Sequence, residues 1–140
     1  DPEHKRGIKR EVIQEWINSG IIEYLGTTKD VRHFIELADC VVLPSYREGT
    51  PRTLLEAASS SKPIVATNVP GCTQVVEDKI NGLLCNLKDS EDLAAKMRTM
   101  ANFDDDTLKS MGISGRKKME AEYDESIVID KYLHTLAELA

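Results

Sequence analysis

The chain has 140 residues, 24 acidic and 18 basic side chains, a formal net charge of −6 and a sequence pI near 5.1. This length fits one domain, which buries roughly 65–70% of the surface of its unfolded chain. The acidic balance argues against nucleic-acid binding through phosphate neutralisation. No run approaches the ~20 apolar residues that a membrane span needs.

The three cysteines are odd in number, lack the spacing of metal ligands, and each lie in or beside an apolar segment. We interpret Cys40, Cys72 and Cys85 as buried, reduced thiols of a cytoplasmic protein. The chain begins at Asp1, and no signal-peptide pattern follows. We therefore expect a piece of a longer cytoplasmic protein.

Helical and extended patterns alternate over the first 85 residues. Apolar spacing predicts a helix over residues 5–18, ended by Gly20, and a short strand over residues 21–25. A helix over 30–38 follows. The continuous apolar run at 40–43 is typical of a strand that is covered on both faces.

The same alternation continues with a helix over 51–60, a strand over 63–67, a short helix over 73–76 and a strand over 83–85. Strands that alternate with helices need crossover connections and form a parallel sheet. We predict an α/β fold with a doubly wound, Rossmann-like parallel sheet of four strands.

The remainder predicts a helical tail over residues 90–140. Its first helix covers 91–101 with Ser90 as N-cap, a second covers 104–123 with a break near 112–115, and a third covers 124–139. Asp104-Asp105-Asp106 resembles an Asp-x-Asp metal-binding motif, but it precedes a helix, so capping is the better interpretation. His4, His33 and His134 share no metal spacing, and we expect neither a metal ion nor a cofactor.

The segment from Glu48 to Glu56 carries the strongest functional signal, because the apolar strand before it leads into Gly49, Thr50 and Pro51. Pro51 suits the first position of a helix. The N–H groups that follow it and the helix dipole then form an anion site.

The two glutamates add a second chemistry to this anion site, because carboxylates accept hydrogen bonds from hydroxyls. In open α/β sheets a ligand lies beyond the carboxyl ends of the strands, where loops 26–30, 44–51 and 68–73 meet. The pattern therefore fits a ligand with phosphates and hydroxyls, such as a nucleoside diphosphate sugar. A plainer interpretation stays open: Glu48 and Glu56 are solvated charges, and Thr50 caps the helix. Arg47 and Arg52 either contact phosphate or are solvated loop charges.

Residues 41–57, VVLPSYREGTPRTLLEA, resemble the signature of glycosyltransferase family 4, which contains retaining enzymes of GT-B fold. Segments 22–26, 62–72 and 81–84, and Met111, Gly112 and Arg116, match the same family in the same order. The resemblance implies the C-terminal, donor-binding half of a GT-B fold. It extends to bacterial enzymes that build surface polysaccharides.

The resemblance implies that Glu56 binds the ribose of a UDP- or GDP-linked sugar and that Glu48 is catalytic and contacts the transferred hexose. Donor-binding residues implied with them are Gly26, Arg47, Gly49, Thr50, Arg52, Thr53, Leu55 and Glu56. Departure of the diphosphate is then stabilised without an obligatory metal ion.

The resemblance also implies that residues 1–140 are a partial nucleotide-sugar-binding domain, which lacks its first strands and the whole N-terminal domain. We expect this piece alone to be inactive, the glycan or lipid-linked acceptor to bind the absent domain, and the full-length protein to lie at the inner membrane face. Exposed sheet edges predict association. Ser61 stands where the family has a left-handed Gly, and Gln74 replaces a common Glu. A sugar-nucleotide epimerase or phosphorylase of the same fold and a non-catalytic nucleotide-binding module remain alternatives.

Overall fold

The computed structural model describes residues 7–138 and divides the chain into two compact units, Asp1–Asp30 and Val31–Ala140. In the first unit, α1 (Arg10–Asn18) has Ser19 as its C-cap and is followed by Gly20, whose φ is +73°. Lys5 and Arg6 of the predicted helix lie outside the described residues, and residues 7–9 are not helical.

The strand predicted over residues 21–25 is wrong. These residues form no strand, and their apolar side chains are exposed, with Ile21 at 71% and Tyr24 at 56%. A strand is completed by a neighbour that pairs with its backbone groups. Every described strand belongs to the other unit and pairs there, so the apolar run has no partner.

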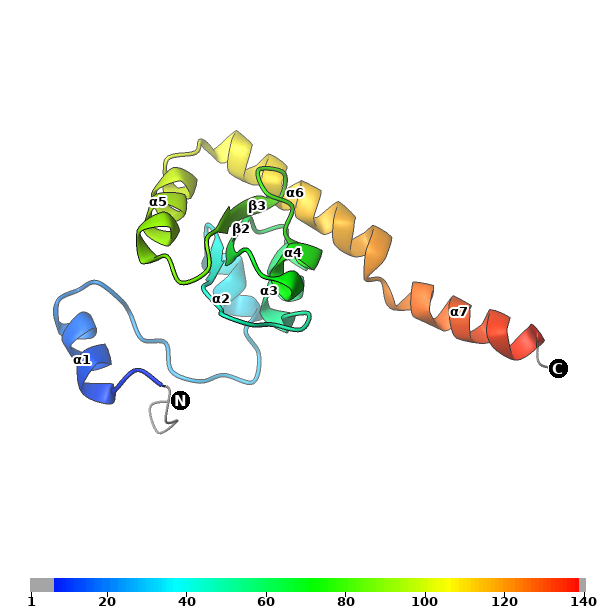
Figure 1. Cartoon of the computed structure of the whole chain (residues 1–140), viewed down its shortest axis with the longest axis horizontal. Helices are drawn as coiled ribbons and strands as arrows, with labels where there is room; N and C mark the ends of the chain where they lie inside the picture. The colour runs from blue at the N-terminus through cyan, green and yellow to red at the C-terminus, as the bar shows by residue number, and fades with distance from the viewer. Residues whose placement is uncertain (1–6, 139–140) are drawn as a thin grey trace. The chain divides into compact units, whose positions relative to one another are not determined.

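The second unit is built on a parallel sheet, which has three strands among the described residues rather than the four predicted (Figure 1). Its order is β1 (Val41–Leu43), β2 (Ile64–Thr67) and β3 (Gly82–Cys85). Val42 pairs with Val65, and Val65 with Leu83. The other three predicted strands are thus confirmed, and all four residues of β2 are buried. The first of them, β1, was predicted to be covered on both faces, but it is only half-buried, and so is Cys40 before it.

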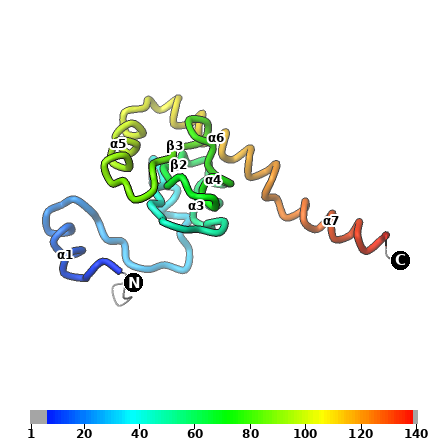
Figure 2. The backbone as a smooth tube through the Cα atoms, viewed as in Figure 1, coloured from blue at the N-terminus to red at the C-terminus, as the bar shows by residue number. Residues whose placement is uncertain are grey.

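Helices cover both faces of this sheet, which confirms the doubly wound arrangement. Alternate residues of β2 enter different apolar clusters, as expected because successive side chains of a strand point to opposite faces. Ile64 and Ala66 pack with residues of α3 (Arg52–Ser59) and α4 (Pro70–Val75), whereas Val65 packs with Met100 of α5 (Ser90–Ala101). Figure 2 follows the backbone through these crossovers.

The helix α6 (Asp105–Glu122) runs without the break predicted near residues 112–115. Its glycines serve close packing instead. A Cβ on Gly112 would lie 1.9 Å from the carbonyl oxygen of Ser61, so α6 approaches the end of α3 only because that atom is absent. Arg116 Nη1 donates to the Ser59 carbonyl at 2.6 Å beside this contact.

Caps explain several helix boundaries. Asp89, not Ser90, is the N-cap of α5, because its extended backbone lets its carboxylate accept the Asp92 N–H at 2.9 Å. Asp104 caps α6 through the Thr107 N–H at 2.7 Å, as predicted. Ser61 has a φ of +55°, which confirms the left-handed residue expected after α3.

The remaining helices agree with the predictions apart from their bounds. The structure has α2 (Arg32–Leu37) and α7 (Glu125–Glu138), and α4 begins at Pro70 rather than at residue 73. Leu139 lies outside the described residues. The predicted helical tail is confirmed as α5, α6 and α7.

Candidate functional site

The loop between β1 and α3, residues 44–51, lies at the carboxyl edge of the sheet, where ligands bind in open α/β folds. Pro51 is the N-cap of α3, with φ −72° and ψ 119°, rather than its first helical residue as predicted. Its carbonyl accepts the N–H groups of Leu54 and Leu55 at 3.0 and 3.2 Å. The helix therefore begins at Arg52.

The N-terminus of α3 is open to an anion. No side chain caps it, and its first turn contains no acidic residue. The first N–H groups of a helix, here those of Arg52 and Thr53, have no partner within the helix. The side chains of both residues are exposed. The local field therefore favours a negatively charged ligand.

Thr50 does not cap α3, so the plainer interpretation is wrong for this residue. Its hydroxyl donates to Gln74 Oε1 at 3.0 Å and joins the loop to α4. This contact gives a structural role to Gln74. The amide oxygen accepts a hydrogen bond that ties two sequence-distant segments together.

Glu48 is half-buried and held in place from two sides. The Ser45 hydroxyl donates to Glu48 Oε1. The helix α4 also packs directly against the backbone of the loop, because a Cβ on Gly71 would lie 1.6 Å from the Gly49 carbonyl oxygen. Burial raises the pKa of the Cys72 thiol, and the nearby Glu48 carboxylate raises it further. The Glu48 carboxylate is thus fixed close to the start of α4.

The other predicted site residues differ in exposure. Glu56 is exposed on α3, one turn after Arg52, while Leu55 is half-buried and packs against the core. Arg47 is exposed in the loop. Gly26 belongs to the first unit, where its φ is +74°. One loop and one helix therefore bring together every predicted donor-binding residue except Gly26.

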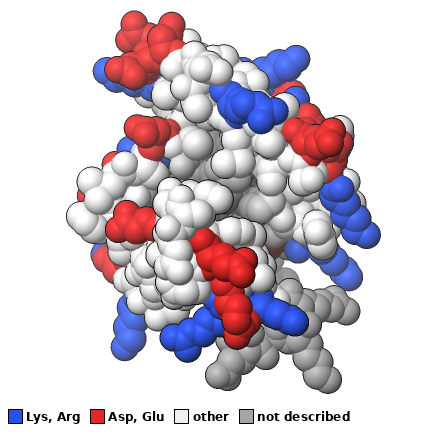
Figure 3. Space-filling view, turned by 90° about the vertical axis from the view of Figure 1, so that its left-hand side faces the viewer, with Lys and Arg blue, Asp and Glu red and all other residues white. Residues whose placement is uncertain are grey.

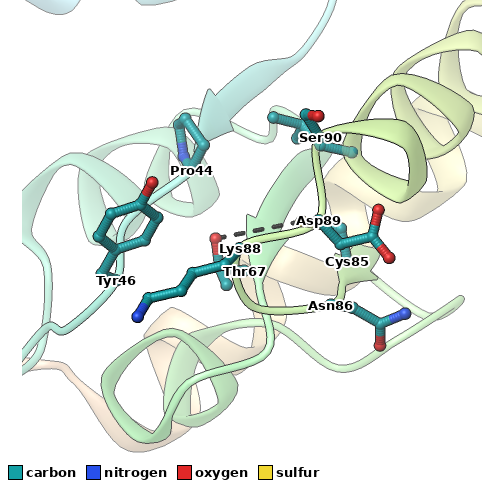
Figure 4. A pocket seen from close by; sticks show the side chains of 9 residues that line it. Pro44, Tyr46, Thr67, Cys85, Asn86, Lys88, Asp89 and Ser90 are labelled. Carbon is teal, nitrogen blue, oxygen red and sulfur yellow. Dashed lines mark hydrogen bonds between the residues drawn. The ribbon is translucent and has the colours of Figure 1, made fainter.

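A hollow of about 360 Å³ opens beside this loop, at the ends of all three strands (Figure 4). Tyr46 and Thr67 line one part of it, and the segment from Cys85 to Ser90 lines another. On the face shown in Figure 3, acidic and basic side chains are interspersed, without a broad basic surface. The hollow was not predicted, because its walls come from three segments that are far apart in the sequence.

Sequence reasoning also assigned no role to Ser45 and Gly71, although both lie in segments that it had singled out. The sequence feature that could have indicated a packing role for Gly71 is its position directly after Pro70 at the start of a helix. Within residues 7–138, no group of three or more His, Cys, Asp and Glu is placed to hold a metal ion. No helix within these residues has the length and apolar character of a membrane span.

A family model described as "Glycosyl transferases group 1" matches residues 2–102. The chain belongs to this family. In Campylobacter jejuni, an N,N'-diacetylbacillosaminyl-diphospho-undecaprenol alpha-1,3-N-acetylgalactosaminyltransferase is 33% identical over 119 residues. That match covers 85% of this chain and 31% of the relative. An Escherichia coli UDP-Gal:alpha-D-GlcNAc-diphosphoundecaprenol alpha-1,3-galactosyltransferase is 30% identical over 95 residues, which are 68% of this chain and 24% of the relative.

Solved structures show the same fold. Anabaena HepE in complex with UDP superposes with a TM-score of 0.79 at 23% identity, over 92% of this chain and 36% of that one. Sucrose-phosphate synthase from Thermosynechococcus elongatus gives 0.82 at 22% identity, over 100% and 37%. These neighbours have the GT-B fold, and the described chain is an α/β part of it with a helical tail. The chain spans about a third of the length of these proteins or less.

Proposed function

We propose that the chain is the donor-binding part of a retaining glycosyltransferase of family 4. In the full-length protein, this enzyme transfers a hexose from a UDP- or GDP-linked sugar to a glycan or lipid-linked acceptor. The observation that carries the proposal is the uncapped, acid-free N-terminus of α3 beside a fixed glutamate. One end of this site suits a diphosphate and the other a sugar.

Each group of this site has a role in the transfer. The N–H groups of Arg52 and Thr53 bind the diphosphate and stabilise the negative charge that develops as it leaves. Glu48, oriented by the Ser45 hydroxyl, accepts hydrogen bonds from the hexose. Glu56, one turn further along the exposed face of α3, binds the ribose hydroxyls. The acceptor oxygen bonds to the anomeric carbon on the same face of the hexose from which the diphosphate departs, so the anomeric configuration is retained.

The comparisons support the substrate classes. The name of the E. coli relative specifies a UDP-linked galactose donor, and both curated relatives are named for lipid diphosphate acceptors. The HepE structure contains UDP. By analogy, we propose a UDP sugar as donor and a bacterial surface polysaccharide as product. Such an acceptor would place the protein in the cytoplasm, at the inner face of the membrane.

Because the chain spans about a third of its relatives, we propose that residues 1–140 are a partial donor domain. Transfer, and the contacts with the acceptor that lie outside this chain, then require the other two-thirds of the fold. Metal-independent departure of the diphosphate is part of the proposal, since the α3 N-terminus supplies the compensating charge.

Calorimetric titration with UDP and GDP, without metal and then with magnesium, tests the proposal. We expect one nucleotide to bind without metal. Because hydrogen bonds to a charged group contribute about 1.5–3 kcal/mol, Glu56→Ala should weaken binding about 10- to 100-fold. Glu125→Ala, an exposed glutamate on α7, is the control and should bind as wild type. Equal binding by all three proteins would contradict the ribose assignment.

A further inference from the structure

The hollow beside the donor loop is lined by none of the residues to which the donor is assigned. Tyr46, two residues before Glu48, forms one wall, and Thr67 lies at the end of the central strand β2. In Figure 4 the ring of Tyr46 and the side chain of Lys88 lie on one side, and Ser90 comes from the start of α5. Its volume of about 360 Å³ is within the range of ligand pockets, ~300–1,000 Å³.

The charges around the hollow disfavour an anion. Unlike α3, α5 already has its N-terminus satisfied by its own carboxylate, because Asp89 accepts the Asp92 N–H. Glu91 and Asp92 add negative charge to its first turn. Asp92 in turn accepts the Asn86 N–H at 2.7 Å. Lys88 is the one cation among the lining residues, and it lies over the ring of Tyr46, 5.8 Å from its centroid.

The walls do suit a neutral ligand that has both apolar and hydroxyl surfaces. The Tyr46 side chain is 68% exposed and offers an aromatic face to the C–H groups of a sugar ring. The Thr67 side chain is only 3% exposed. Among the described residues, its hydroxyl makes one side-chain hydrogen bond, which it accepts from the Cys85 thiol at 4.0 Å. Its hydrogen is therefore available to a ligand hydroxyl.

We propose that this hollow binds one neutral sugar ring of the acceptor glycan, stacked on Tyr46 and hydrogen-bonded to Thr67. The inference rests on the proposed function and deepens it. The donor's charge goes to the open end of α3, and an uncharged sugar goes to the hollow on the other side of the same loop. The two sites share residues 44–51, so the acceptor sugar is held beside the hexose that Glu48 contacts.

Saturation-transfer NMR on the full-length protein tests this site, with methyl N-acetyl-β-D-glucosaminide as the probe. We expect transfer to the C–H protons of the sugar in wild type. Tyr46→Ala should reduce it about three- to tenfold, the effect of losing one aromatic contact. Tyr46→Phe keeps the ring and should keep the signal. Tyr132→Ala is the matched control, because Tyr132 on α7 is 69% exposed.

UDP titration of the same samples separates this inference from the proposed function. Tyr46→Ala should bind UDP within twofold of wild type, and Glu56→Ala should bind UDP about 10- to 100-fold more weakly while keeping the sugar signal. Failure of wild type to bind either nucleotide would overturn the proposed function. Three results would overturn the sugar site: no transfer in wild type, unchanged transfer in Tyr46→Ala, or loss of the sugar signal on adding inorganic phosphate.

Discussion

Replacing Gly71 by Ala tests whether α4 holds the donor loop in place. The added Cβ would lie 1.6 Å from the Gly49 carbonyl oxygen and 2.6 Å from that of Glu48. Ordinary van der Waals contact begins near 3.4 Å, so the loop has to move by roughly 1.8 Å relative to α4. Both neighbours are backbone atoms, which have no rotamer to change.

The displacement has two measurable consequences. Overpacking of this kind costs about 1–3 kcal/mol of stability. A misplacement of about 1 Å in a site costs on the order of 10²-fold in activity, because the reacting groups lose their alignment. We therefore expect Gly71→Ala to unfold at lower denaturant concentration and to bind UDP at least about tenfold more weakly.

Two other glycines supply the controls. Gly112→Ala creates a similar overlap, 1.9 Å from the Ser61 carbonyl oxygen, but between α6 and the end of α3. It should lose similar stability and keep its UDP affinity. On Gly115 a Cβ meets only ordinary contacts, the nearest at 3.5 Å, so Gly115→Ala should stabilise α6 by roughly 0.5–1 kcal/mol. Full UDP affinity in Gly71→Ala, with only a loss of stability, would refute the positioning role of α4.

Two further predictions concern stability. Ser61 has a φ of +55°, and a side chain in this left-handed region costs roughly 1–2 kcal/mol. Ser61→Gly should therefore raise the free energy of unfolding by up to about 1 kcal/mol without changing UDP binding, and a destabilised variant would contradict the strain. The Lys118 side chain, 14% exposed, pairs with Glu77 and Glu122 at 2.7 and 3.0 Å, and the hydrogen bond to Glu77 is the largest cause that raises its pKa above 10.5. The ion pairs of Lys118 therefore stabilise the fold fully below pH 10.5, and this stabilisation is lost as pH rises through the folded-state pKa. Lys118→Met should cost about 1 kcal/mol or less near pH 7. In urea unfolding, the difference in stability from wild type should shrink above about pH 10.5, and a constant difference would contradict the assignment.

Local sequence patterns predicted the secondary structure correctly where the residues of a single segment determine it. The apolar runs that became β1, β2 and β3 are short and continuous, and a parallel sheet lets them pack into apolar clusters on both faces, although β1 is only half-buried. The run at residues 21–25 has the same local character, yet it forms no strand. Its outcome depends on a pairing partner, which its own residues do not encode.

The errors at helix ends have a related cause. Ser90 and Asp89 are both good caps by residue type, and backbone geometry selected Asp89. Gly112 and Gly115 indicated a break because glycine weakens a helix in isolation. In the folded protein they allow α6 to pack against the residues at the end of α3, and that packing keeps the helix continuous.

By itself, the sequence determined the alternation of strands and helices, the Rossmann-like class, the family and the loop that carries Glu48 and leads to Glu56. These follow from local spacing and from motifs that are contiguous along the chain. Only the tertiary structure decided that Ser45, Gly71 and Gln74 hold this loop, and that three distant segments enclose the hollow beside Tyr46. The physical reason is that contacts between strand ends depend on how the parallel sheet brings its loops to one edge, which no single segment specifies.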